Sequence, residues 1–131
     1  MTSAFICGLA GAALTEEERA FLRQARPWGV ILFRRNVESR AQLRALADSV
    51  REALGDARAP ILVDQEGGRV QRLSPPRWAA YPPGAVYGRL YGRDPALGLR
   101  AARLGAAGYR VVGVNSEQAW GKASDELVKL V

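Results

Sequence analysis

Three short apolar runs alternate with two amphipathic segments in the first half of the chain, and this order constrains the fold more than any other feature. The runs are Phe5–Leu9, Val30–Phe33 and Ile61–Val63, each of strand length and apolar throughout. Strands without a polar face are typical of parallel sheets, which are covered on both sides. The order strand, helix, strand, helix, strand therefore predicts a parallel α/β sheet with right-handed crossovers.

The two intervening helices are predicted from their amino-terminal signals. At each, a hydroxyl residue is followed three positions later by Glu or Gln, so that the two side chains can cap each other's backbone N–H groups. These pairs are Thr15 with Glu18 and Ser39 with Gln42. We expect one helix over residues 16–26, ended by Pro27 and Gly29, and another from about residue 40 to Gly55, a residue that readily ends a helix.

The second half of the chain has a less regular pattern. Residues 74–92 are rich in Pro, Gly, Tyr and Trp, which predicts a long loop that its aromatic side chains hold together. Asp94-Pro95 then predicts a third helix, because aspartate is a good N-cap and proline suits the first helical position. Residues 111–114 indicate a short strand, and Ser116 indicates the start of a last helix. All arginines lie at or before Arg110, whereas both lysines follow it.

The nine residues 64–72, Asp-Gln-Glu-Gly-Gly-Arg-Val-Gln-Arg, follow the third apolar run directly. The change from apolar to charged residues places Asp64 at the carboxyl end of a strand, where α/β proteins bind their ligands. Two adjacent glycines favour a sharp bend after it. If this loop were turn-like, Arg69 and Arg72 would face one site. The alternative for Asp64 is a loop aspartate that caps local N–H groups.

Residues 64–73 resemble the signature of the glycoside hydrolase family three β-N-acetylhexosaminidases, bacterial enzymes that recycle cell-wall sugars. The segments that add to the resemblance are Gly29–Phe33 with Arg35-Asn36, and Pro75-Pro76 with Trp78 and Tyr81–Pro83. The resemblance covers residues 4–106. It implies the amino-terminal portion of a (β/α)8 barrel, and 131 residues are too few for a complete barrel of about 250. We therefore expect residues 1–106 to form part of such a barrel and residues 107–131 to be a divergent tail of unknown origin.

The resemblance also implies the roles of individual residues. Asp64 and Arg72 match substrate-binding residues of the family, which hold the terminal N-acetylglucosamine, and Arg72 has the fork of donors that suits ring and acetamido oxygens. Glu66 and Arg69 are expected to support the loop through a salt bridge. No catalytic residue is assigned, because the family's nucleophile is an aspartate far downstream and its proton is handled by a histidine–aspartate pair. This sequence has no histidine.

These expectations describe a cytoplasmic β-N-acetylhexosaminidase chain that acts on cell-wall-derived sugars as part of peptidoglycan recycling. The chain alone would hold part of the sugar pocket and would be inactive. Two alternatives remain open. One is a non-catalytic carbohydrate- or partner-binding α/β module. The other is a phosphosugar-binding α/β protein, because two arginines also suit an anionic ligand.

Composition narrows the remaining function classes. The net charge of +6 comes from scattered arginines, without a basic run interleaved with aromatic residues, so we expect no nucleic-acid partner. No apolar run has transmembrane length, which predicts no membrane partner. The single cysteine, Cys7, fits a reducing compartment. Without histidine or ligand spacing we expect no metal, and without a nucleotide motif no cofactor. Unpaired edges of an incomplete sheet predict self-association.

Overall fold

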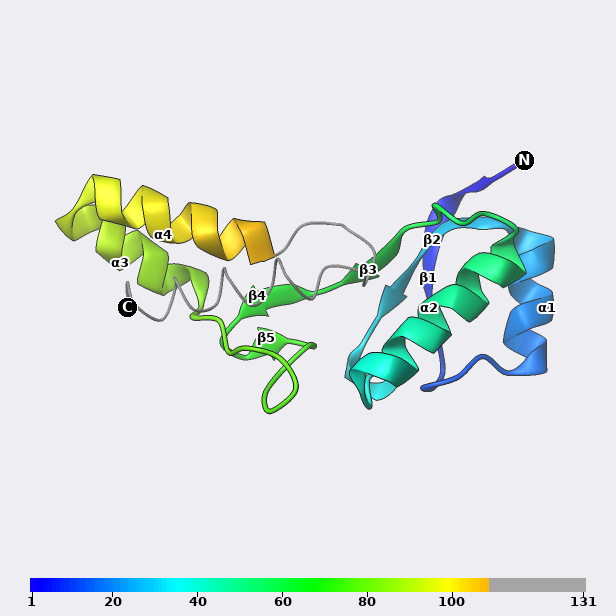
Figure 1. Cartoon of the computed structure of the whole chain (residues 1–131). Coiled ribbons are helices and arrows are strands. Elements are labelled where there is room, and N and C mark those ends of the chain that lie inside the picture. Colours follow the sequence, from blue (N-terminus) through cyan, green and yellow to red (C-terminus); the bar gives the residue numbers. More distant parts are fainter. Residues whose placement is uncertain (109–131) are drawn as a thin grey trace. The chain divides into compact units, whose positions relative to one another are not determined.

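The computed structural model describes residues 1–108 (Figure 1). They fall into two compact units, Met1–Asp64 and the described part of a second unit that starts at Gln65. Each unit is described by itself. The strand expected at residues 111–114, the helix expected after Ser116 and nearly all of the expected tail lie outside the described residues.

The first unit contains three parallel strands in the order β1-β2-β3. Their bounds are Ser3–Gly8, Pro27–Leu32 and Ile61–Val63. The predicted parallel order is confirmed, and β3 has the predicted bounds. Strand β2 starts earlier than expected, because Pro27 begins a strand instead of ending a helix. Proline is tolerated at the first position of a strand, where its missing N–H costs little.

Helices α1 (Glu16–Ala25) and α2 (Arg40–Leu54) connect these strands, as predicted. Both capping boxes are present, and at α1 the Glu18 N–H donates to Thr15 Oγ1 at 3.1 Å while the Thr15 N–H donates to Glu18 Oε2 at 3.0 Å. Helix α2 ends at Gly55, whose φ of 64° lies in the left-handed region that glycine adopts readily. The sequence signals therefore located both helices.

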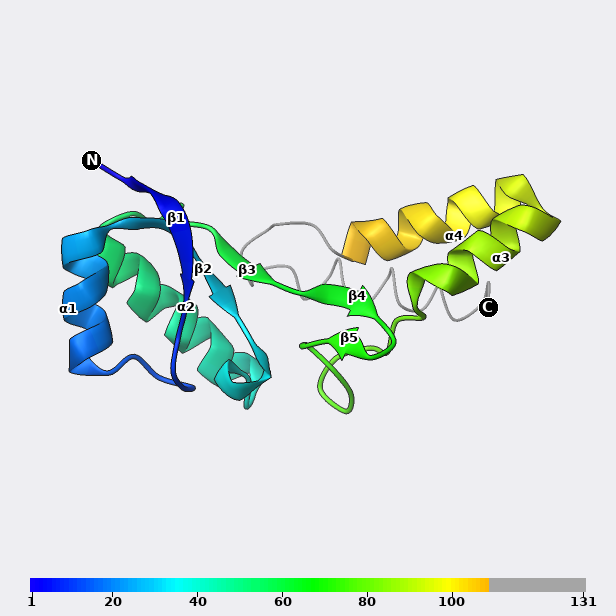
Figure 2. The same ribbon diagram turned by 180° about the vertical axis from the view of Figure 1, so that it is seen from behind.

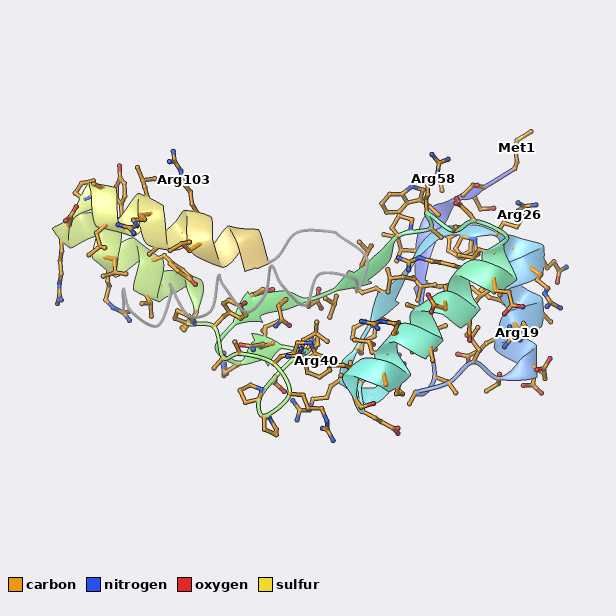
Figure 3. All side chains as sticks on the ribbon, in the orientation of Figure 1. Met1, Arg19, Arg26, Arg40, Arg58 and Arg103 are labelled. Atoms are coloured by element: carbon orange, nitrogen blue, oxygen red, sulfur yellow. The ribbon has the colours of Figure 1, made fainter. Side chains whose placement is uncertain are left out.

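Both helices cover the same face of the sheet. Helix α2 lies in front of the strands in Figure 1 and behind β1 in Figure 2. Arg19 of α1, labelled in Figure 3, forms an ion pair with Glu52 of α2 at 3.7 Å. An apolar core lies between the helices and the strands. The fully or nearly fully buried side chains of this core include Leu22, Val30, Leu43, Leu46 and Val50. Parallel strands usually have such cover on both faces.

The outer strand β1 is the least covered part of this unit. Phe5 is 39 % exposed and touches Phe21 of α1 edge-to-face, whereas Ile6, on the opposite face, is 44 % exposed. Within the first unit β1 pairs with no strand other than β2. One edge of β1 therefore keeps its backbone groups available to a further strand.

The second unit consists of a β-hairpin followed by two helices. The hairpin strands β4 (Gln65–Gly67) and β5 (Val70–Gln71) are antiparallel. Helix α3 spans Gly84–Arg93 and helix α4 spans Pro95–Gly108. The start of α4 is as predicted, since the Leu97 N–H donates to the Asp94 side chain at 3.0 Å.

The prediction of a loop over residues 74–92 was wrong for its second part, because α3 is a helix. Three glycines suggested a loop, but in α3 they have open space around them, and helix–helix packing outweighs their low propensity. The packing is close: a Cβ on Gly98 would lie 2.4 Å from Tyr91 Cα, and one on Gly105 would lie 2.7 Å from Tyr87 Oη. Small residues on α4 therefore allow α3 to form. No helix among the described residues is long and apolar enough to span a membrane.

Candidate functional site

Polar residues gather at the carboxyl ends of the three parallel strands. The register pairs Gly8 with Ile31 and Leu32 with Val63, so the chain leaves all three strands at the same edge of the sheet. Asp64 leaves β3 at this edge and is half-buried. The predicted position of Asp64 is thereby confirmed.

The loops that leave β1 and β2 are joined by one buried amide. Asn36 is fully buried in the short 3₁₀ turn η1 (Arg34–Asn36). Its Oδ1 accepts from the Phe33 N–H at 2.7 Å, and its Nδ2 donates to the carbonyls of Leu9 at 3.1 Å and Gly11 at 2.7 Å. Two loops far apart in the sequence therefore form one rigid rim beside Asp64. Only the family resemblance had drawn attention to Asn36.

Arg35 belongs to the same rim. Its Nε donates to the Leu9 carbonyl at 2.8 Å, and its guanidinium carbon lies 4.7 Å from the centre of the Phe33 ring. A Cβ on Gly8 would lie 3.4 Å from Arg35 Nη2 and 3.2 Å from Phe33 Cε2. Gly8 thus leaves room at the end of β1 for both side chains.

In the second unit, the Gly-Gly pair forms the bend that the sequence predicted. Gly67 and Gly68 have φ values of 82° and 58°. A Cβ on Gly67 would lie 2.3 Å from the Pro82 carbonyl oxygen, and the Gly68 N–H donates to the Tyr81 carbonyl at 2.9 Å. Both the backbone angle and the close approach of residues 81–82 therefore require glycine at position 67.

Two buried glutamines hold the segment after the hairpin, and the sequence analysis missed both. Gln65 and Gln71 are paired across the hairpin and are each 8 % exposed. Gln65 Nε2 donates to the Leu73 carbonyl at 2.8 Å, and its Oε1 accepts from the Leu73 N–H at 3.0 Å. Gln71 Nε2 donates to the carbonyls of Leu73 and Ala79, and its Oε1 accepts from the Tyr81 N–H at 2.9 Å. We call these two side chains the glutamine clamp.

The remaining residues of the motif differ in burial. Arg72 is half-buried and lies between clamped Gln71 and clamped Leu73, whereas Glu66 and Arg69 are exposed. Within residues 1–108, Glu66 and Arg69 form no ion pair with each other. The loop is supported by the glutamine clamp instead, because buried amides can satisfy backbone groups that a surface ion pair cannot reach. Arg69 lies in the turn before β5 and Arg72 lies in the bend after it.

Burial is the main cause of the pKa shifts of three side chains, two tyrosines of the second unit and the cysteine of β1. Burial raises the pKa of Tyr81, with a smaller contribution from Tyr87, and burial also raises the pKa of Tyr87. Both phenols therefore stay neutral at physiological pH. Burial likewise raises the pKa of the Cys7 thiol, which makes it a poor nucleophile. Among the described residues, His, Cys, Asp and Glu form no cluster of three or more that could hold a metal ion.

No family model matches the sequence. The β-hexosaminidase of Bordetella avium strain 197N is 44% identical over 96 residues, which is 72% of this chain and 27% of that protein. The chain is a homologue of the bacterial β-hexosaminidases. This identity confirms the family resemblance noted at residues 64–73. The chain spans about three tenths of the length of the curated relatives it matches.

Two solved structures extend this relationship to the fold. NagZ from Neisseria gonorrhoeae in complex with N-trifluoroacetyl-D-glucosamine is 30% identical, with a TM-score of 0.73 over 81% of this chain and 31% of that chain. A glycoside hydrolase family 3 β-N-acetylglucosaminidase from Paenibacillus sp. strain FPU-7 is 23% identical. It has a TM-score of 0.64 over 80% of this chain and 20% of that chain, and at this identity it shows a shared fold alone. The α/β arrangement of the described residues is therefore that of part of a β-hexosaminidase.

Proposed function

We propose that this chain supplies part of the sugar pocket of a β-N-acetylhexosaminidase that removes terminal N-acetylglucosamine from cell-wall-derived sugars. The observation that carries the proposal is the position of Asp64 at the carboxyl end of β3, directly before the clamped hairpin that leads to Arg72. The relatives' name and the glucosamine derivative bound to NagZ support the choice of sugar. A cytoplasmic location and a role in peptidoglycan recycling belong to the same proposal.

The two proposed sugar-binding residues have complementary chemistry. The Asp64 carboxylate accepts hydrogen bonds from two sugar hydroxyls at once, which neutral acceptors do less strongly. The Arg72 guanidinium offers donors in a fixed plane to ring and acetamido oxygens. Gln65 bonds to both the N–H and the carbonyl of Leu73, the residue after Arg72, and so fixes the backbone at this end of the motif. Such rigidity lowers the entropy lost when a sugar binds.

We further propose that residues 1–106 are part of a (β/α)8 barrel, that residues 107–131 are a divergent tail, and that the chain alone is inactive. Retaining glycosidases use two carboxyl groups or their equivalents on either side of the scissile bond, about 5–5.5 Å apart. The family resemblance assigns neither role to a residue of this sequence, which also lacks the histidine of the family's proton-transfer pair. Binding without turnover is therefore the expected behaviour.

Catalysis is tested with a nitrophenyl N-acetyl-β-glucosaminide as substrate. The purified chain is expected to release nitrophenol no faster than buffer alone. Turnover that Asp64→Asn abolishes would overturn the inactive assignment and would make Asp64 and Glu66 the catalytic pair.

Sugar binding is tested by titrating N-acetylglucosamine into the chain and following the backbone amide signals by NMR. Asp64→Asn is expected to weaken binding about tenfold or more, because a hydrogen bond to a charged group contributes roughly 1.5–3 kcal/mol. Glu66→Gln removes one carboxylate from an exposed position of the same motif and serves as the control. Equal affinities of the wild type and Asp64→Asn would show that the motif is structural.

The same substitution can be tested for activity in an intact β-hexosaminidase that has these residues. Alanine at the counterpart of Asp64 is expected to weaken substrate binding strongly, because the sugar hydroxyls lose a charged acceptor. An unchanged KM together with an unchanged kcat would contradict the proposed role.

A further inference from the structure

Asn36 is the only fully buried polar side chain among the described residues. Burying an amide is costly unless its donors and its acceptor are paired, and here all of them are. Its Oδ1 accepts from the Phe33 N–H, and its Nδ2 donates to the carbonyls of Leu9 and Gly11. These two carbonyls belong to residues 9–12, which follow β1 and which we call the β1 loop. A fully satisfied buried network fixes one arrangement of the segments that it joins.

Helices α1 and α2 extend this network to the rest of the β1 loop. Gln42, in the first turn of α2, donates through Nε2 to the carbonyl of Ala12 at 2.6 Å and to that of Asn36 at 3.1 Å. From α1, the Glu18 Oε1 accepts from the Ala10 N–H at 2.7 Å. Each residue of the β1 loop is therefore bonded through its backbone to a side chain of another element.

The β1 loop has little packing of its own to hold its shape. Residues 10–12 are Ala, Gly and Ala, and a Cβ built on Gly11 would have no atom within 4 Å. Small residues beside open space are free to take many backbone conformations, and fixing each of them costs entropy. The order of this loop therefore comes from the side chains of Glu18, Asn36 and Gln42.

Asn36 also shapes the chain directly beside Asp64. Leu32 pairs with Val63, so the residues that follow, Phe33 and Asp64, leave neighbouring strands side by side. Asn36 Oδ1 accepts from the Phe33 N–H at 2.7 Å, and the Asn36 N–H donates to the Phe33 carbonyl at 2.9 Å. Neighbouring strands are about 4.8 Å apart, so a ligand held at Asp64 lies next to the segment that Asn36 fixes.

We propose that Asn36 is a positioning residue of the proposed sugar site, which holds the η1 turn and the β1 loop in the arrangement that accepts a sugar at Asp64. The proposal rests on the proposed function and assigns the shape of the pocket wall to a side chain buried beneath it. A wall that is ordered in advance loses no further entropy when the sugar binds. If only a fraction of the molecules had an ordered wall, the apparent Kd would rise by the inverse of that fraction.

Two substitutions remove the donors of the network and keep its acceptors. Asn36→Asp keeps an oxygen for the Phe33 N–H but turns a carboxylate toward the carbonyls of the β1 loop. Gln42→Glu keeps the oxygen that accepts from the Glu38 N–H, and glutamate suits this position of a capping box. Each is expected to weaken binding of N-acetylglucosamine to the 131-residue chain about tenfold or more, measured by NMR titration. If Asn36→Asp does not fold, Gln42→Glu, at a half-buried position, decides the question.

Two control variants separate positioning from charge and from stability. Gln24→Glu makes the same chemical change at an exposed glutamine of α1. Val50→Ala leaves a cavity at a fully buried position of α2 and lowers stability without removing a bond of the network. Neither variant should change the affinity for the sugar.

The NMR signals of the β1 loop provide a second readout. Because linkage is reciprocal, a sugar that binds only when the loop is ordered must also order the loop. Saturating N-acetylglucosamine should therefore move the Gly11 and Ala12 amide signals of Asn36→Asp toward those of the sugar-bound wild type. A residue that only stabilises the fold would not produce this response.

The possible failures separate this proposal from the proposed function. If both network variants bind the sugar as well as the wild type does, the positioning role is refuted and the sugar site stands. The same conclusion follows if Val50→Ala weakens binding as much as Asn36→Asp does, or if the β1 loop signals of Asn36→Asp do not respond to saturating sugar. If the wild type itself does not bind N-acetylglucosamine, the proposed sugar function is refuted, and the positioning role with it.

Discussion

Replacing Gln71 by methionine removes half of the glutamine clamp while preserving the length of the side chain. In the wild type, the Gln71 amide bonds to the carbonyls of Leu73 and Ala79 and accepts from the Tyr81 N–H. The Leu73 carbonyl keeps its bond from Gln65 after the substitution. The Ala79 carbonyl and the Tyr81 N–H lose the partner that Gln71 provides, and Tyr81 is only 3 % exposed.

The energetic cost of Gln71→Met follows from these two groups. A buried backbone group left without a partner costs about 1–3 kcal/mol. Ala79 is half-buried, so its carbonyl recovers part of that loss from water, and the total is roughly 2–4 kcal/mol. This is a large share of the ~5–15 kcal/mol by which domains are stable. The cost falls on residues 73–81, because Gln71 connects the hairpin to that segment.

Amide hydrogen exchange measures this effect at single residues. The Tyr81 amide is expected to exchange about 30- to 1000-fold faster in Gln71→Met, since each 1.4 kcal/mol corresponds to a factor of ten. The Leu22 amide, in the middle of α1, should change little. Gln24→Met is the control, because it makes the same substitution at an exposed glutamine of α1. Unchanged exchange at Tyr81, together with an unchanged free energy of unfolding, would refute the argument that this clamp orders the segment.

Three further outcomes follow from the helices and the outer strand. Gly98→Ala should lower the free energy of unfolding by several kcal/mol, because the added Cβ meets the backbone of Tyr91. Gly88 has open space around it, so Gly88→Ala should raise the free energy of unfolding by up to ~1 kcal/mol. Urea titration of both variants compares the two effects. Tyr87→Phe should stabilise the chain by about 1 kcal/mol, because its buried hydroxyl has no hydrogen-bond partner among the described residues. Because the pKa of Tyr87 is raised in the folded chain, this tyrosine ionises at lower pH in the unfolded chain. The wild-type free energy of unfolding is therefore unaffected by this group below pH ~10 and falls as the pH rises from there through the folded-state pKa. The fall should be less steep in Tyr87→Phe, and thermal melts across this range measure the slope. Ile6→Lys should reduce self-association, because a charge on an exposed edge strand opposes strand pairing; sedimentation of a wild-type chain that is already monomeric at micromolar concentration would contradict this.

The first unit was predictable because its signals are local. A capping box involves residues three apart, and an apolar run such as Ile61–Val63 needs no distant partner to be read as a strand. The second unit was less predictable because its structure depends on contacts between segments. Helix α3 contains glycine at every fourth position, and it is the close approach of α4 at Gly98 that makes these residues helical.

The residues of the candidate site were likewise predictable where the signal is local and unpredictable where it depends on distant partners. The position of Asp64 follows from an apolar run that ends at a carboxylate, and the bend at Gly67 follows from two glycines in succession. The glutamine clamp could not be predicted, because most of its partners are backbone groups eight or ten residues away. A sequence also does not distinguish a buried glutamine from an exposed one. The expected salt bridge between Glu66 and Arg69 was wrong for the complementary reason: opposite charges near each other in sequence do not outweigh hydration when both are exposed.

Each strand of the first unit is hydrogen-bonded only to strands that precede or follow it directly in the chain. All the pairing within Met1–Asp64 therefore forms without any residue that is synthesised later. During translation this segment has its complete set of internal partners as soon as Asp64 has left the ribosome, and we expect it to fold there while later residues are still being added.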